Sequence, residues 1–421
     1  MKNLIKKLKL RRRAIALFAA LHFFGNPSAK LKIVGVTGTN GKTTTATLLY
    51  KIAIELGYKA GLIGTVENLI NGEKVEATHT TPDPISLNKL LNKMVEAKCE
   101  YVFMEVSSHA LDQGRVAGIN FIGGIFTNLT HDHLDYHKSF ENYFLAKKKF
   151  FKMLSSTVFA LTNADDEYGK KILDNIKAKK YFYGFSPDVG RLSGVQHPTA
   201  QYFRGEIKKL DFNGLELLFN KEEIHSKLLG KFNAYNLLAV WSACSLLGFD
   251  AAKVNKILEN IEPPCGRFEH FTSGNGVLVI VDYAHTPDAL EKILEAVREI
   301  KSKEGKFISV FGCGGDRDPL KRPIMGKIGT TNSDIAIFTS DNPRSEDPDK
   351  IIEEMKTNLS DGDLQKVKTI SNRSEAIQEA VKLAQKGDII LVAGKGHEDY
   401  QIIKGVKHHF DDMEELKKAF S

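Results

Sequence analysis

The stretch that decides the fold is Val34–Leu49, VGVTGTNGKTTTATLL. An apolar strand, Lys32–Thr37, leads into a turn of glycine and polar residues, and a helical run follows from about Thr43. Backbone N–H groups in such a turn can surround phosphate oxygens, and the start of the helix adds positive potential. We therefore predict a nucleotide-binding loop that consists of Gly38, Thr39, Asn40, Gly41, Lys42, Thr43 and Thr44.

Lys42 is expected to reach the β- and γ-phosphates of ATP, and Thr43 is expected to hold Mg²⁺. The usual motif has one more glycine upstream, at the position of Val36, so this loop is a shortened GxxGKTT variant. An ordinary glycine turn is the alternative for a bare GxxGK. The strand before the loop and the helical run after it favour nucleotide binding.

Length and composition indicate a soluble globular protein of several domains. The 421 residues are enough for two or three domains, and 42% hydrophobic and 26% charged residues are ordinary values. No CxxC pair occurs, which argues against a zinc ribbon and a disulfide framework and predicts reduced thiols. The four cysteines are Cys99, Cys244, Cys265 and Cys313.

The positive charge is concentrated at the N-terminus. Residues 1–32 contain nine Lys and Arg and no acidic residue, and removing these nine from the net charge of +7 leaves −2 for the rest of the chain. A nucleic-acid-binding protein needs a basic face on its body. We therefore expect no nucleic-acid partner.

Residues 1–30 form a separate N-terminal segment in which a basic half precedes the apolar run 14–24. This run is too short to span a bilayer. A secretory signal has a similar order, but an ATP site follows directly and ATP is a cytosolic substrate, so we expect a cytoplasmic protein. Two interpretations stay open: a basic amphipathic helix at residues 1–24 on the inner membrane face, or a helix packed on the body.

From Lys32 to about Glu262, short apolar strands alternate with helical runs. This alternation predicts an α/β domain with a mostly parallel sheet, which would bind ligands at the carboxyl ends of its strands. The predicted strands are Lys32–Thr37, Ala60–Thr65, Tyr101–Val106, Gly123–Thr127 and Val158–Thr162, and the predicted helices are Thr43–Leu56, Ile85–Ala97, Phe140–Leu154 and Asn233–Leu247.

The prolines of Ile261–Pro264 interrupt this pattern and predict a linker. We expect a central ATP-binding domain at 31–262 and a C-terminal Rossmann-like α/β domain at 263–421. Its predicted strands are Val277–Val281, Phe307–Phe311, Ile335–Thr339 and Ile389–Val392, and its predicted helices are Asp288–Ile300, Pro348–Asn358 and Arg373–Ala384.

Polar residues at strand ends predict a metal site in the first domain. Glu105 ends one strand, and His133 lies in the dense run His131–His137, HDHLDYH, after another. A carboxylate suits Mg²⁺, and the spacing does not match a zinc site. One such histidine alone would more simply cap a helix, but this density favours a functional loop.

Four polar clusters follow strands of the second domain, at residues 282–288, 312–318, 340–346 and 393–399. Each could be a simple turn, but four at one sheet edge predict a binding face. Its arginines could bind carboxylates in a bidentate manner, and its acidic residues could bind an ammonium group. The arrangement suggests a zwitterionic amino acid as ligand.

Taken together, the motifs resemble those of the Mur ligases over about residues 31–412. The motifs occur in family order: TGTNGKTT, MEVSSHAL, TNLTHDHLDYH, GKFNAYNLLAV, GRFE, DYAHTPDAL, GCGGDRD, DNPRSE and AGKGHEDYQ. The resemblance is greatest to the branch that adds meso-2,6-diaminopimelate to UDP-N-acetylmuramoyl-L-alanyl-D-glutamate in peptidoglycan synthesis. It implies an ADP-forming amide ligase that uses ATP and Mg²⁺, and DNPR is typical of diaminopimelate rather than lysine addition.

The resemblance also implies roles for individual residues. Lys42, Glu105, His133 and Lys147 would be catalytic, and the Mg²⁺ ligands would be Thr43, Glu105, His133 and Lys147. The run 143–147 resembles the family's YxxAK, whose lysine is carbamylated, so Lys147 rather than Lys148 or Lys149 would be N6-carboxylated. From the residues alone, a solvated lysine run is the simpler interpretation.

The same comparison assigns the remaining sites. The further nucleotide residues would be Asn233, Asn236, Arg267 and Asp282. The muramoyl-dipeptide would contact Thr80, Thr81, Ser107 and Arg115. The diaminopimelate pocket would contain Arg317, Asp341, Asn342, Arg344, Gly394 and Glu398.

One departure from the family concerns the donor. Mur ligases of this branch carry a UDP-binding domain before the phosphate loop, where this sequence has about thirty residues. The uridine end would be held weakly or by other surfaces, or the donor would differ. We expect a monomer in which closure of the two domains shields an acyl phosphate from water.

Other functions remain open. A relative such as folylpolyglutamate synthase or cyanophycin synthetase shares the ATP chemistry, and a Mur-like ligase could add lysine or another amino acid to a different carboxylate donor. A non-ligase Mur-like subunit of an amidotransferase would carry clustered zinc-binding cysteines, which this sequence lacks. A catalytically silent scaffold would not need Lys42, Glu105, His133 and Lys147 intact.

Overall fold

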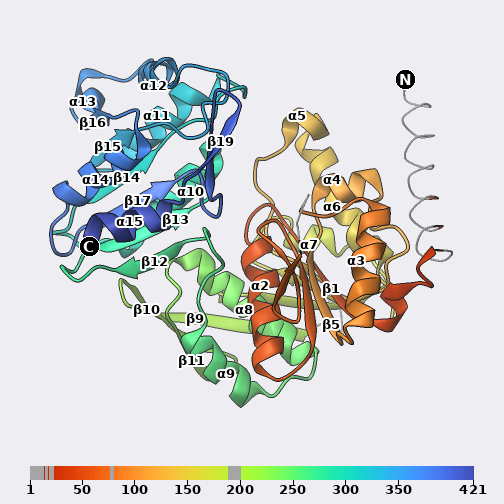
Figure 1. Ribbon diagram of the computed structural model, residues 1–421. Coiled ribbons are helices and arrows are strands. Elements are labelled where there is room, and N and C mark those ends of the chain that lie inside the picture. The colour runs from red at the N-terminus through yellow and green to blue at the C-terminus, as the bar shows by residue number, and fades with distance from the viewer. Residues whose placement is uncertain (1–13, 15–17, 19–22, 76–79, 188–200) are drawn as a thin grey trace. The chain divides into compact units, whose positions relative to one another are not determined.

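The computed structural model describes residues 14, 18, 23–75, 80–187 and 201–421. The chain divides into two compact units (Figure 1). Unit 1 comprises Met1–Lys209, Leu215–Leu228 and Phe232–Ile261, and unit 2 comprises Leu210–Gly214, Leu229–Lys231 and Glu262–Ser421. The predicted membrane-facing segment 1–24 lies almost entirely outside the described residues. Among the helices that are described, none has the length and apolar character needed to cross a bilayer.

Unit 1 is built on a sheet with the strand order β11-β10-β9-β8-β7-β6-β1-β5-β2-β3-β4. The strands from β9 to β2 in this order run parallel, and antiparallel pairs lie towards both edges. The strands are β1 (Lys32–Thr37), β2 (Ala60–Ile63), β3 (Asn68–Ile70), β4 (Glu73–Val75), β5 (Tyr101–Glu105), β6 (Phe121–Phe126), β7 (Phe159–Asn163), β8 (Lys179–Gly184), β9 (Gln201–Asp211), β10 (Gly214–Phe219) and β11 (Glu222–Ser226).

Helices connect these strands in the manner of a parallel α/β fold. A short 3₁₀ helix, η2 (Pro27–Lys30), precedes β1. The α-helices are α2 (Lys42–Glu55), α3 (Pro84–Glu96), α4 (Ser108–Gln113), α5 (Leu134–His137), α6 (Phe140–Met153), α7 (Gly169–Ile172), α8 (Lys231–Leu246) and α9 (Ala251–Asn260).

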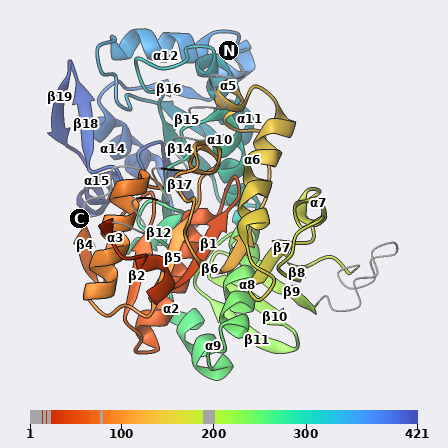
Figure 2. The ribbon, with the colours of Figure 1, turned by 90° about the vertical axis from the view of Figure 1, so that its right-hand side faces the viewer.

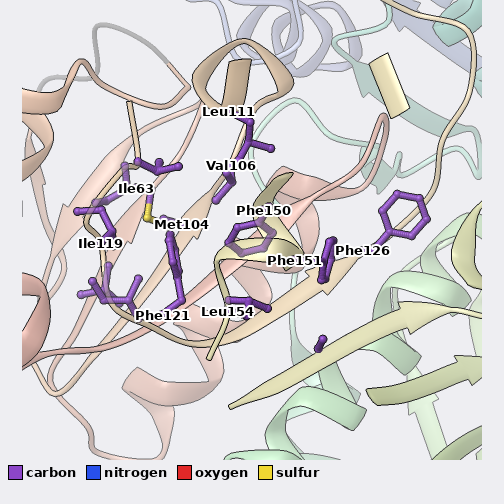
Figure 3. Packing of buried hydrophobic residues seen from close by; sticks show 14 of the residues in the cluster. Ile63, Met104, Val106, Leu111, Ile119, Phe121, Phe126, Phe150, Phe151 and Leu154 are labelled. Atoms are coloured by element: carbon purple, nitrogen blue, oxygen red, sulfur yellow. The ribbon is translucent and has the colours of Figure 1, made fainter. Parts of the chain in front are cut away.

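One core of unit 1 lies between the sheet and helix α6 (Figure 3). Phe150, Phe151 and Leu154 face Phe121 and Phe126 of strand β6. The buried side chains of α6 recur three or four residues apart, which is the spacing of one helix face. Lys147 lies on this buried face with the aromatic residues, and this is the first sign that it is not part of a solvated lysine run.

Unit 2 has a sheet with the order β12-β13-β17-β14-β15-β16, in which β12 is the antiparallel edge and the other pairs are parallel. A hairpin of β18 and β19 forms a separate small sheet. The strands are β12 (Glu269–Thr272), β13 (Leu278–Asp282), β14 (Phe307–Phe311), β15 (Ile335–Phe338), β16 (Val367–Thr369), β17 (Ile389–Ala393), β18 (Tyr400–Ile403) and β19 (Val406–His409). The helices are α10 (Pro287–Ile300), α11 (Lys321–Asn332), α12 (Pro348–Lys356), α13 (Asp361–Leu364), α14 (Arg373–Leu383) and α15 (Asp412–Phe420).

The central strands of unit 2, β13, β14 and β17, are buried on both faces, because helices cover both. Leu278, Ile280 and Leu391 belong to a core with α10, α11 and α12. Val279 and Val392 belong to a second core with α14 and α15. Figure 2 shows the strands between these two helix layers. Alternate residues of one strand thus enter opposite cores, as the period of two along a β-strand requires.

Every strand and helix that the sequence predicted is present, with ends within two residues of the expected ones. The linker residues 261–264 are irregular and lie where the main segment of unit 2 begins. The assignment of ATP binding to residues 31–262 and of amino-acid binding to residues 263–421 remains a prediction. The strands of the 201–226 region and helix α11 were not predicted.

Candidate active site

The phosphate loop joins β1 to α2 in the form that the sequence indicated. Gly41 caps α2 in the left-handed region, with φ +82°. A Cβ atom at this position would lie 2.4 Å from Oδ1 of Asn236 on α8. Asn236 in turn donates from Nδ2 to Oδ1 of Asn233 at 3.1 Å. The structure therefore places both predicted asparagines directly behind the loop.

The segment that follows β6 holds the loop in place, since β6 is the sheet neighbour of β1. The Asn40 N–H donates to Oδ1 of Asn128 at 2.9 Å, and the Thr127 hydroxyl donates to the Asn40 carbonyl at 2.6 Å. The Thr39 N–H donates to the Asn128 carbonyl at 2.8 Å. The sequence placed Thr127 and Asn128 in the motif TNLTHDHLDYH after a buried strand, but neither was given a role of its own.

Two lysine amines meet at one carbonyl of the loop. Lys42 Nζ donates to the carbonyls of Gly38 at 3.1 Å and Thr39 at 2.7 Å. Lys147 Nζ donates to the same Gly38 carbonyl at 2.6 Å. Thr43 and Thr44 begin α2 and are buried. The predicted catalytic residues Lys42 and Lys147 thus donate to one acceptor of the loop.

Lys147 is enclosed to an extent that its two lysine neighbours are not. It is 1% exposed, and its amine lies 4.5 Å from the centre of the Tyr143 ring. Burial, followed by the charge of Lys42, holds the pKa of Lys147 well below its ordinary value. Lys149 instead pairs with Asp112 at 2.8 Å, and Lys148 is half-buried. Only a neutral amine reacts with carbon dioxide, so the environment of Lys147 suits carbamylation.

Glu105 provides a buried carboxylate at the end of β5. It is 1% exposed and accepts from the N–H of Thr65 at 2.7 Å and from its hydroxyl at 3.1 Å. Both donors are neutral, and no cation pairs with Glu105 within the described ranges. A buried carboxylate without a positive partner is unfavourable unless a cation binds. This observation fits a metal ligand. Thr65, which follows β2, was missed by the sequence analysis.

His133 lies in the loop before α5, with φ +53°. Partial burial lowers its pKa, and the charges of Lys42 and Lys147 lower it further, against the opposing effect of Asp132. The ring is therefore neutral at pH 7, which is the form that binds metals. Within the described residues no three His, Cys, Asp or Glu side chains gather as a metal site. The predicted Mg²⁺ ligands include only two residues of these types, Glu105 and His133. The other two predicted ligands are Thr43 and the carbamate of Lys147.

The four predicted donor-binding residues gather around Glu105. Thr80 accepts from the Thr65 hydroxyl at 3.0 Å, and the Thr81 hydroxyl donates to the Glu105 carbonyl at 2.8 Å. Thr81 also contacts the other two residues. The Ser107 N–H donates to the Thr81 hydroxyl at 3.1 Å, and the Arg115 guanidinium donates to the Thr81 carbonyl at 2.8 Å.

In unit 2, the side chain of Asp282 holds the segment that carries Arg267. Asp282 ends β13 and accepts from the N–H groups of Phe268 and Ala284, each at 2.8 Å. Burial raises the pKa of Asp282, and Arg267 opposes this effect. The Arg267 guanidinium lies 4.8 Å from the centre of the Tyr283 ring. The carboxylate therefore shapes the loop that carries Arg267.

The predicted acceptor residues follow the carboxyl ends of β14, β15 and β17. Asn342 donates to Glu398 at 2.9 Å, and Arg344 donates to the Gly315 carbonyl at 2.6 Å. Asp341 lies beside Gly394, and its Oδ1 atom is buried without a hydrogen-bond partner in the described structure. This cluster of two acids and a guanidinium suits a ligand with both ammonium and carboxylate groups.

Arg317 is the least constrained of the predicted acceptor residues. Its side chain is exposed, and a long bond of 3.4 Å joins it to the Asp316 carbonyl. It lies beside Gly314, which also neighbours the Arg344 guanidinium. The structure thus brings the loop of Arg317 next to the loop of Arg344 without fixing the Arg317 side chain.

Comparison with known proteins gives these sites a family. Residues 36–244 match the Mur ligase middle domain, and residues 266–396 match the family described as Mur ligase, glutamate ligase domain. The chain belongs to the Mur ligase family. All predicted site residues of this Mur ligase lie within the matched ranges except Glu398, which is two positions beyond the second.

Individual relatives support the same assignment. The chain is 52% identical over 399 residues to the UDP-N-acetylmuramoyl-L-alanyl-D-glutamate--2,6-diaminopimelate ligase of Parabacteroides distasonis, covering 95% of this chain and 80% of the relative. A solved structure of a ligase with that name has a TM-score of 0.68 and 31% identity, covering 96% of this chain and 82% of the other. Folylpolyglutamate synthase from Thermotoga maritima has a TM-score of 0.69 at 15% identity, covering 92% and 90%, and therefore shares the fold alone.

Proposed function

We propose that this Mur ligase adds meso-2,6-diaminopimelate to UDP-N-acetylmuramoyl-L-alanyl-D-glutamate during peptidoglycan synthesis, with cleavage of ATP to ADP and phosphate. The observation that carries the proposal is the 52% identity to a ligase with this named activity over 95% of the chain. The acceptor cluster supports it, because Asp341, Arg344 and Glu398 offer both charges that the free amino-acid end of diaminopimelate requires.

The chemistry would proceed in two steps. The γ-carboxylate of the D-glutamyl residue attacks the γ-phosphorus of ATP, and ADP leaves. The amine of the acceptor then attacks the acyl carbon, and the amide forms as phosphate leaves and the nitrogen loses a proton. Lys42 would neutralise charge on the transferred phosphoryl group. The predicted donor residues Thr80, Thr81, Ser107 and Arg115 would hold the muramoyl-dipeptide beside the loop.

Mur ligases use ATP together with Mg²⁺, and the residues of unit 1 fit this ion. Thr43, Glu105, His133 and Lys147 as its carbamate would hold it, and the ion would supply positive charge for phosphoryl transfer. The remaining nucleotide residues would be Asn233, Asn236, Arg267 and Asp282. In this proposal residues 31–262 bind ATP, and residues 263–421 bind the acceptor.

The acceptor assignment is tested by Arg344→Ala. Removing the guanidinium should raise KM for diaminopimelate by roughly 10- to 100-fold, because a charged hydrogen bond contributes about 1.5–3 kcal/mol. KM for ATP should stay within about twofold. The assay is release of ADP with the muramoyl-dipeptide and each candidate amino acid.

Arg298→Ala is the control, because Arg298 is an exposed residue of α10. An equal rise in both KM values of Arg344→Ala would mean that Arg344 is structural. ADP release that lysine stimulates and diaminopimelate does not would contradict the acceptor itself.

For residues 1–24 we propose peripheral contact of this cytoplasmic, monomeric enzyme with the inner membrane face. The nine basic residues within 1–32 motivate this proposal. Deletion of residues 1–24 should abolish co-sedimentation with anionic vesicles, whereas neutral vesicles should not bind the full chain. Unchanged sedimentation of the deletion variant would refute the contact, and light scattering would give the oligomeric state.

A further inference from the structure

Helix α11 carries a buried arginine, Arg322. Arg322 is 1% exposed, and its guanidinium binds two carboxylates. Nη2 lies 2.9 Å from Oε1 of Glu346, and Nη1 lies 2.7 Å from Oε2 of Glu354. Glu354 belongs to helix α12, whereas Glu346 belongs to the DNPRSE loop that carries the acceptor residues. The two carboxylates therefore bind Arg322 in a similar way, but one belongs to a helix and the other to a loop of the proposed acceptor site.

Glu346 also contacts the second acceptor loop. Its Oε1 atom accepts from the Asp316 N–H at 2.5 Å, in the GCGGDRD sequence next to Arg317. Ser345 adds to this link, because its hydroxyl donates to Asp316 Oδ1 at 2.6 Å. One carboxylate oxygen of Glu346 thus joins Arg322 of α11 to the loop of Arg317 and, through its own backbone, to the loop of Arg344.

The backbone of both loops needs such support. Arg344 has φ +55° and Asp316 has φ +54°, a region that non-glycine residues adopt at an energetic cost. Strained residues persist only where surrounding contacts determine them. The loops are also close, because a Cβ atom at Gly315 would lie 2.0 Å from the Pro343 carbonyl. A shift of either loop would therefore move the other, and with it the Arg344 guanidinium that donates to Gly315.

We propose that Arg322 and Glu346 are a positioning pair that sets the relative place of the two acceptor loops and thereby the affinity for the amino acid. Neither residue belongs to the predicted acceptor set. The pair acts through Asp316 and Arg344, and this inference rests on the proposed acceptor site of unit 2. The hydrogen bonds from Arg322 and from the Asp316 N–H lower the pKa of Glu346, which favours its charged form.

The structure supplies a matched pair of variants. Glu346→Ala and Glu354→Ala each remove one carboxylate of Arg322 and leave the other, so the arginine keeps a partner in both. Only Glu346→Ala also releases the Asp316 N–H. Glu346→Gln keeps an oxygen that can accept from Asp316 but removes the charge, and therefore serves as the conservative variant.

The experiment measures KM for the amino acid and for ATP in the full chain. Glu346→Ala should raise the acceptor KM by about tenfold or more, since a misplacement of 1 Å can change reactivity by about 10²-fold. Glu354→Ala should leave this KM within about twofold, and Glu346→Gln should lie between them. KM for ATP should change by less than about twofold in all three variants. Thermal unfolding should show similar losses of Tm for the two alanine variants.

Three results would overturn the positioning role: an unchanged acceptor KM in Glu346→Ala, equal rises in Glu346→Ala and Glu354→Ala, or a parallel rise in KM for ATP. If Glu346→Ala does not fold, Glu346→Gln decides in its place against Glu354→Gln. Failure of the proposed function is distinguishable, because the parent chain would then release no ADP with diaminopimelate. The same variants would then be tested with whichever amino acid stimulates the parent.

Discussion

Lys147→Met should lower kcat by about 10³-fold, the effect expected when a preorganised electrostatic group is lost from a phosphoryl-transfer site. Methionine suits the aromatic face of α6 on which Lys147 lies, so folding should persist. The Tm should rise or stay equal, because no amine remains to be buried. Steady-state ADP release and thermal unfolding provide the two measurements.

Removal and return of carbon dioxide test whether Lys147 acts as a carbamate. The parent enzyme should lose activity in bicarbonate-free buffer and regain it when bicarbonate returns, and ¹³C-labelled bicarbonate should give a carbamate signal that is absent from Lys147→Met. Lys148→Met is the control, since Lys148 is only half-buried and should retain activity and signal. More than a tenth of the parent kcat in Lys147→Met would contradict a catalytic carbamate.

The pH dependence has a defined sign. Because the folded pKa of Lys147 lies below the unfolded value near 10.5, the unfolded chain binds the extra proton between these two values. The free energy of unfolding of the bicarbonate-free parent should therefore rise with pH across this window relative to Lys147→Met. Equal slopes for the two proteins in urea unfolding would show that the amine is not buried as described.

Gly41→Ala should abolish ATP-dependent turnover, with kcat/KM for ATP falling by at least about 10²-fold. An alanine would have to adopt φ +82° and would place its Cβ 2.4 Å from Asn236 Oδ1. The loop must move, and its bonds to residues 127 and 128 would break with it. ADP release and binding of a fluorescent ATP analogue would measure the loss.

Gly57→Ala is the control that separates the clash at Gly41 from the strain of a positive φ angle. Gly57 follows the other end of α2, has φ +88°, and has open space where a Cβ would lie. This variant should lose about 1–2 kcal/mol of stability from strain and keep its affinity for ATP. If Gly57→Ala weakens ATP binding as much as Gly41→Ala does, global destabilisation rather than the loop explains the result.

The fold was predictable where periodicity was strong. Strand β1 has the expected bounds Lys32–Thr37, and four strands of unit 2, β13, β14, β15 and β17, were predicted because they are apolar along nearly their whole length. The shorter or more polar strands β12, β16, β18 and β19 were not predicted. Strand β9 was missed because its eleven residues, QYFRGEIKKLD, are largely polar, and most of them are partly or fully exposed. Helix α11 was missed because KRPIMGKIGTTN contains one proline and two glycines. Gly326 is close to the Met355 carbonyl, so packing against α12 overrides poor helix propensity.

The candidate site was predictable as a set of strand ends, but its internal bonds were not. Glu105 and the acceptor clusters follow buried strands, which sequence can indicate. The enclosure of Lys147 depends on the tertiary placement of one helix face, and Lys-Lys-Lys alone suggests the opposite. Thr65 and Glu346 hold other residues through hydrogen bonds, a role that no local pattern reveals.

The hairpin of β18 and β19 binds the backbone of the loop that carries Arg344, although the hairpin follows this loop by almost sixty residues in the sequence. The Arg344 N–H donates to the Ile402 carbonyl and the Arg344 carbonyl accepts from Lys404, both near the end of the sequence. During synthesis, domains form from the N-terminus onwards. The phosphate loop can therefore be assembled while the ribosome is still adding residues that Arg344 needs. A chain released before residue 404 would lack the backbone bond from Lys404 to Arg344. If the proposed sites hold, premature termination should impair amino-acid selection before it impairs nucleotide binding.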